Sequence, residues 1–181
     1  VELYKAITNK LHAESQKAGG VEKTGEWTRM QSSPRRAKFR GALTLYYDRL
    51  PADVDVSAAD APGIFAAALR SLVGSRRVDY GELTFFGDTR YSRGGKAVRK
   101  VLGRTGDSVF GSAVKMPVDI YEGPAMNHSY HEMIIGHGHC FSTVLLCEKA
   151  ERIAAAEYTA DYHRAQFLAT QMALAERRRY V

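Results

Sequence analysis

Six cationic side chains and no acidic one lie between Asp88 and Asp107. They fall in or next to the stretch YSRGGKAVRKVLGRTG at 91–106, and are Arg90, Arg93, Lys96, Arg99, Lys100 and Arg104. Such a run can bind phosphate groups, a nucleic-acid backbone or an anionic membrane surface.

The glycines of this stretch resemble the end of a nucleotide-binding loop, in which backbone N–H groups wrap phosphates and a Ser or Thr holds Mg²⁺. Here Arg90 stands at the first glycine position and Ala97 at the Ser or Thr position. We therefore expect neither ATP nor GTP to bind there.

The chain also has one cluster of side chains that could bind a metal. It consists of His128, His131, His137, His139, Cys140 and Cys147. On one strand, His137 and His139 would share a face and supply two ligands, whereas structural zinc normally takes four with a characteristic spacing. A hairpin with exposed histidines and buried cysteines accounts for the same residues, so we expect no metal and no other cofactor.

A nucleophilic enzyme would need a Cys or Ser, a His and a third group that orients the His. Cys140 or Cys147 with His131 and Asp119 could supply these groups, but no local sequence around them is typical of a nucleophile. We expect the protein not to be an enzyme. The two cysteines are seven residues apart, which would place them on opposite faces of one strand and argues against a disulfide between them.

Composition favours a single globular domain with an anionic partner. The 181 residues carry a net charge of +6, and residues 1–50 hold ten Lys and Arg against five acids. No run approaches the roughly 18 apolar residues of a membrane span, so any membrane role should be peripheral. Without a CxxC pair or an apolar leader, the chain is typical of an intracellular protein with reduced thiols.

Hydrophobic periodicity predicts the first half of the fold. Leu3, Ile7 and Leu11 indicate a helix that ends at Gly19-Gly20. Alternation from Phe39 to Asp48 indicates one half-buried strand. A helix at 64–73, with Asp60 as N-cap and Pro62 in its first turn, and a strand at 80–87 follow. We expect a loop at 91–106.

In the second half, residues 108–121 should be extended, at a sheet edge or break because of Pro117. Residues 130–147 should form a hairpin around 136–138, and the Ala-rich segment after Glu148 one or two helices that include Ile153 and Ala156. This order predicts a single α+β domain with a mainly antiparallel sheet. We expect an N-terminal helix and basic arm at 1–35, then a core domain with a C-terminal helix at 36–181.

Four segments in this order resemble the matrix proteins of rhabdoviruses. They are FRGALTLYYDRL as the first core strand, GIFAAALRSLVG as the helix on the sheet, GELTFFGDT as the strand before the loop, and HGHCFSTVLLCEKAERIAAAE as the last strand and helix. The chain lacks PPxY and PTAP segments, which suits a plant-infecting member better than an animal one.

The resemblance implies a viral structural protein that acts in assembly and budding. It would self-associate, condense the helical nucleocapsid and link it to the inner face of the envelope. The implied partners are the protein itself, the viral nucleoprotein–RNA complex and an anionic membrane surface, with non-specific RNA binding in addition. It would lie in the virion beneath the envelope, and in the host cell at the cytoplasm and membranes, with the nucleus a further compartment.

In that family the loop after the second core strand docks on a neighbouring subunit, which implies self-association through Val98, Val101 and Leu102. For contacts with an acidic surface, lipid or nucleic acid, the candidates are Arg35, Arg36, Lys38, Lys96, Arg99 and Lys100. The alternative function is a capsid or regulatory protein that contacts a nucleic-acid phosphate backbone through the same basic face.

Overall fold

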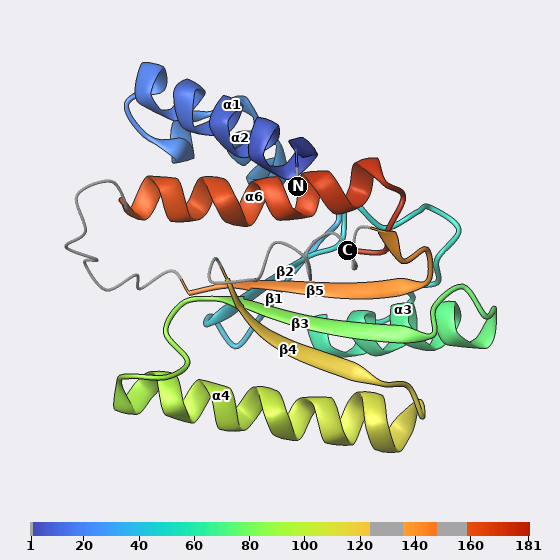
Figure 1. Ribbon diagram of the computed structural model, residues 1–181. Helices are drawn as coiled ribbons and strands as arrows, with labels where there is room; N and C mark the ends of the chain where they lie inside the picture. The colour runs from blue at the N-terminus through green and yellow to red at the C-terminus, as the bar shows by residue number, and fades with distance from the viewer. Residues whose placement is uncertain (1, 124–135, 148–158) are drawn as a thin grey trace.

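The computed structural model describes residues 2–123, 136–147 and 159–181 (Figure 1). Its centre is a three-stranded parallel sheet with the strand order β4 (Val118–Gly123), β3 (Tyr80–Phe86), β5 (Cys140–Leu146). Helix α6 (Ala160–Glu176) lies along one face, and α3 (Ala61–Gly74) lies on the other side. Helix α4 (Arg93–Thr105) lies on the side away from α6 and runs directly into the π-helical turns η2 (Gly106–Ala113).

Three apolar clusters of the described residues hold these layers together. One lies on one face of the sheet, and two lie on the face toward α6, the smaller of them formed by Cys140, Ala173 and Leu174. Leu69 and Leu72 of α3 pack with Leu83 of β3, Phe110 of η2 and Phe141 of β5. On the opposite face, Phe86 and Leu168 belong to a second cluster. Because side chains alternate along a strand, successive residues of β3 contribute to different cores.

The N-terminal segment covers the outer side of α6. It comprises α1 (Glu2–Ala18), η1 (Val21–Lys23) and α2 (Gly25–Ser32). Leu11, Val21 and Met30 from these helices share the second core with Leu168. Since α6 lies between the sheet and α1, it is buried on most of its sides, as its ten buried residues show. The division of the chain into 1–35 and 36–181 stays a prediction.

The expected single strand at 39–48 is partly confirmed, since Leu43–Tyr46 is a strand, but Phe39 belongs to a separate strand and the two form a hairpin. β1 (Arg36–Phe39) pairs antiparallel with β2 (Leu43–Tyr46), and Phe39 lies opposite Leu43. Arg40 and Gly41 form the turn with φ of 51° and 68°. Glycine adopts this left-handed region without steric cost, which makes position 41 a suitable turn residue.

The α+β class of a single compact domain is confirmed, but the mainly antiparallel sheet is wrong. Antiparallel pairing is confined to β1 and β2 among the described strands, and the larger sheet is parallel. The reason is that 91–106 is not a loop. Helix α4 carries the chain from the end of β3 back to the start of β4, and such a crossover makes the two strands parallel.

Other expectations have mixed outcomes. The helices α1 and α3 and the strand β3 are confirmed, and the Asp60 carboxylate accepts the Gly63 N–H at 2.9 Å, as expected of an N-cap. The predicted extension of 108–121 is wrong for its first part, since 106–113 is π-helical and β4 begins only after Pro117. The first strand of the expected hairpin, together with Ile153 and Ala156, lies outside the described residues.

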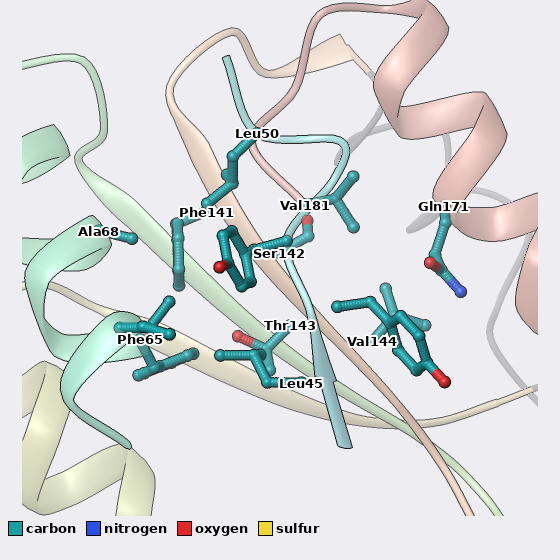
Figure 2. A pocket seen from close by; sticks show the side chains of 13 residues that line it. Leu45, Leu50, Phe65, Ala68, Phe141, Ser142, Thr143, Val144, Gln171 and Val181 are labelled. Carbon is teal, nitrogen blue, oxygen red and sulfur yellow. The ribbon is translucent and has the colours of Figure 1, made fainter. Parts of the chain in front are cut away.

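A small apolar cavity lies where β2, α3, β5 and α6 meet (Figure 2). It measures about 70 Å³, and Leu45, Phe65 and Phe141 contribute to its apolar lining. Thr143 also lines it, and its buried hydroxyl has no hydrogen-bond partner among the described residues. Ligand pockets usually measure about 300 to 1,000 Å³, so we interpret this cavity as incomplete core packing.

Candidate anionic-surface site on helix α4

A tight turn between β3 and α4 is held by the carboxylate of Asp88. Its oxygens accept the backbone N–H groups of Arg90 and Tyr91 at 2.8 Å and of Ser92 at 2.7 Å. The Ser92 hydroxyl in turn caps the helix by accepting the Gly95 N–H at 2.9 Å. These backbone groups therefore face an internal anion and are not free to cradle a phosphate.

The same hydrogen bonds favour the ionised form of Asp88. The side-chain bond with Ser92, and then the N–H groups of Tyr91, Arg90 and Ser92, hold the pKa of Asp88 below its usual value. Gly95 is required next to this carboxylate, because a β-carbon at position 95 would collide with it.

Helix α4 has one buried side and one basic side. Gly95 and Leu102 are buried and Val98 is half-buried, at the spacing i, i+3, i+7 of an inward face. Five cations are exposed: Arg93, Lys96, Arg99, Lys100 and Arg104. None of these five forms a salt bridge with another residue in 2–123, 136–147 or 159–181. Their charge is therefore available to an external anion.

Exposed apolar side chains lie beside these cations. Tyr91 is 84% exposed just before the helix and Val101 is 53% exposed within it. The only other large hydrophobic side chain classed as exposed in the described parts is Leu43. At 3.6 residues per turn, Ala97 and Val101 lie on one flank of the outer side, next to the flank that carries Lys96, Lys100 and Arg104. The outer side of α4 is thus both basic and partly apolar.

An open hollow lies at the amino end of this basic side. Thr89, Arg90, Lys96 and Arg99 line it. Arg90 differs from the other cations, because it forms an ion pair with Glu122 of β4. Glu122 also accepts the Thr89 N–H at 3.1 Å, which ties the turn to the neighbouring strand.

The structure changes how the predicted docking residues must be understood. The segment is a helix and not a loop, and Leu102 is only 8% exposed because it faces the molecule's own interior. Val98 is half-buried on the same side. Of the three, Val101 alone is exposed toward a neighbouring subunit or a surface, and its role in self-association stays a prediction.

The six predicted surface contacts separate into two groups. Lys96, Arg99 and Lys100 lie together on α4, as expected from their proximity in sequence. The other three lie in or next to β1, which belongs to the two-stranded sheet: Arg35, Arg36 and Lys38.

Two of those three cations have internal partners. Arg35 donates to the Leu50 carbonyl and lies over the Tyr47 ring at 5.3 Å, while Arg36 donates to the Gln31 carbonyl. Lys38 is exposed. Arg93 and Arg104 were missed as candidates, although the helical spacing of the apolar residues and the N-cap residue Ser92 could have revealed them.

The His/Cys cluster is only partly described. His128 and His131 lie outside the described residues. His137 Nε2 lies 2.7 Å from Asp79 Oδ1, and His139 Nδ1 lies 3.2 Å from the Arg77 carbonyl oxygen. In the described part of the chain, no three His, Cys, Asp or Glu side chains come together as metal ligands would.

Both cysteines are free thiols, as their spacing predicted. Burial raises the pKa of the Cys140 thiol to about 12. Because the thiolate is the nucleophilic form, this residue is a poor nucleophile at neutral pH.

Comparison of the chain with protein-family models, with curated proteins and with solved structures finds no match. Among the described helices, none has both the length and the apolar character that crossing a bilayer requires.

Proposed function

We propose that this protein is a non-enzymatic viral matrix protein that self-associates and attaches peripherally to an anionic membrane through the outer side of α4. The observation that supports this is the set of five exposed cations without ion-pair partners among the described residues, beside exposed Tyr91 and Val101. The proposal includes the role expected from the resemblance, namely condensation of the nucleocapsid beneath an envelope.

The charge of α4 suits a weak, reversible attachment. Each Lys or Arg near an anionic membrane contributes about 1 kcal/mol, so five contribute about 5 kcal/mol. That free energy corresponds to a dissociation constant in the range of about 0.1 to 1 mM for one molecule. Self-association would then make attachment firm, because many weak contacts act together.

The exposed apolar residues favour a membrane over a nucleic acid. Tyr91 could stack on a base, but Val101 and Ala97 gain nothing from a phosphate backbone. At a bilayer surface the same two side chains can enter the interface while the neighbouring cations contact lipid headgroups.

Vesicle flotation tests this proposal. The protein should float with phosphatidylserine vesicles and not with neutral vesicles, and less at high salt because screening weakens the contacts. Replacing Lys100 and Arg104 by Gln should weaken binding by about 30-fold, from about 2 kcal/mol for two cations. Replacing Arg36 and Lys38 by Gln removes the same charge from β1 and should have a much smaller effect.

A parallel binding curve with RNA separates the two functions. Tight, salt-sensitive RNA binding without vesicle binding would overturn the membrane proposal in favour of the nucleic-acid alternative. The size distribution of the purified chain at low and high salt tests self-association. Salt-sensitive polymers without nucleic acid support a matrix protein, whereas a monomer under both conditions contradicts it.

A further inference from the structure

At the amino end of α4, cations from the helix and from the preceding turn border one shallow hollow. Lys96 and Arg99 are three residues apart, so both project from the same side of the helix. Thr89 and Arg90 from the preceding turn complete the lining. Three cations therefore border one open, shallow place on the surface, whereas Lys100 and Arg104 are not part of its lining.

Two of the three cations around the hollow lack an ion-pair partner among the described residues, although the formal charge of the nearby groups, with the Glu122 and Asp88 carboxylates included, is only about +1. Arg90, Lys96 and Arg99 contribute three cations, and Glu122 compensates Arg90 through its ion pair. The other nearby carboxylate, Asp88, is engaged by the backbone N–H groups of the turn. Lys96 and Arg99 have no ion-pair partner among the described residues.

Two neighbouring cations without ion-pair partners among the described residues suit an anion that offers several acceptor oxygens. A phosphate monoester carries about −1.5 to −2 at pH 7, whereas the phosphodiester of an ordinary phospholipid carries only one negative charge. Its three terminal oxygens accept charge-assisted hydrogen bonds, for which Arg and Lys are suitable donors. Thr89 borders the hollow but is only 3% exposed, so Lys96 and Arg99 are the donors for such an anion.

We propose that this hollow binds the phosphate monoester of a phosphorylated lipid headgroup, of the phosphatidylinositol phosphate type. The inference rests on the proposed membrane attachment, which supplies the lipid source. Lys100, Arg104 and Val101 would contact the bilayer surface in general, and Lys96 and Arg99 would select the headgroup. Soluble inositol phosphates and inorganic phosphate present the same kind of phosphate group, so the experiment must distinguish them from the lipid.

Flotation with two vesicle types of equal surface charge tests the selection. One contains phosphatidylserine only, and in the other part of it is replaced by phosphatidylinositol phosphate. The unmodified chain should bind the second type about tenfold more tightly, as expected for two additional charge-assisted contacts. This preference should decline below about pH 6, where the monoester loses its second charge.

Two double variants, each of which removes two positive charges, show which cations produce the preference for phosphoinositide vesicles. Lys96→Gln with Arg99→Gln should abolish the preference, while binding to phosphatidylserine becomes about 30-fold weaker but stays salt-sensitive. Lys100→Gln with Arg104→Gln should weaken binding to both vesicle types and retain their ratio. All four side chains are exposed, so thermal unfolding should be nearly unchanged and serves as the folding control.

Competition identifies the source of the phosphate. A soluble inositol phosphate should displace the unmodified chain from the phosphoinositide vesicles at a lower concentration than inorganic phosphate does. Equal binding to both vesicle types overturns this inference and leaves the proposed membrane function intact. Failure to bind either type overturns both. Binding of soluble inositol phosphate or inorganic phosphate without any vesicle preference overturns the lipid source.

Discussion

Asp88 and Gly95 approach each other so closely that a β-carbon at position 95 would lie 2.5 Å from Asp88 Oδ2. The same carbon would lie 2.7 Å from the Asp88 backbone oxygen, so rotation of the side chain alone could not relieve the collision. The carboxylate holds the turn that leads into α4, and it therefore positions the basic hollow as well.

Gly95→Ala should destabilise the protein by about 1 to 3 kcal/mol, because an added methyl group at a closely packed site forces the backbone to move. Gly103→Ala is the matched control in the same helix, since a β-carbon there would meet nothing within 4 Å. That change should stabilise the protein by up to about 1 kcal/mol, from the higher helix propensity of Ala. Chemical unfolding measures both, and equal effects would contradict the contact.

Asp88→Asn should make stability less dependent on acid pH. The pKa of Asp88 is lowered in the folded state, so its contribution is complete above the unfolded pKa of about 4 and is lost as pH falls below that value. Thermal unfolding of the unmodified protein and the variant should differ at pH 7 and converge in acid. Asp107→Asn is the control, because it removes the same charge from an exposed residue at the start of η2. A constant difference across this range would disprove the role of Asp88.

Glu82→Gln should become increasingly favourable as pH rises. Burial raises the pKa of Glu82, whose carboxyl group accepts hydrogen bonds from the hydroxyls of Thr84 and Ser142. Because the folded state holds this proton more tightly than the unfolded chain, stability declines as pH rises above the unfolded pKa of about 4.3.

The variant cannot ionise, so its free energy of unfolding relative to the unmodified protein should be higher at pH 7 than at pH 4. Denaturant unfolding at both values checks this, and a pH-independent difference would contradict it. Ser142→Ala tests the hydrogen bond separately, since the Ser142 hydroxyl donates to Glu82 Oε2 at 2.7 Å. Its loss should cost about 1 to 3 kcal/mol.

Val101→Asp should impair binding and Leu102→Asp should impair folding, although the two residues are adjacent. Val101 is 53% exposed and Leu102 8% exposed. Val101→Asp should change stability by about 0.5 kcal/mol or less while weakening vesicle binding and self-association. Leu102→Asp should destabilise the fold by about 3 kcal/mol or more, because it buries a charge without a partner. Circular dichroism and sedimentation measure the two effects, and an unfolded Val101→Asp variant would contradict this arrangement of α4.

Local sequence patterns predicted correctly those helices whose formation depends mainly on their own residues. The caps and apolar spacing of α1 and α3 act within a few residues, and both helices were predicted correctly. The basic character of 90–104 was likewise visible in the sequence. The prediction of a loop at 91–106 was wrong because Gly94 and Gly95 disfavour a helix and outweighed two local helix signals, the N-cap residue Ser92 and the spacing of Val98 and Leu102.

The sequence alone therefore determined the α+β class, several elements and the group of cations that is the candidate site, since composition and short-range periodicity encode them. Only the tertiary structure decided that α4 is a crossover helix joining parallel β3 and β4, that β5 is also parallel to β3, and that Leu102 faces inward while Val101 faces outward. It also decided which cations border the hollow and which are paired, as Arg90 is with Glu122. These properties depend on contacts between residues distant in sequence. The free energy of such contacts cannot be predicted from a short stretch of sequence.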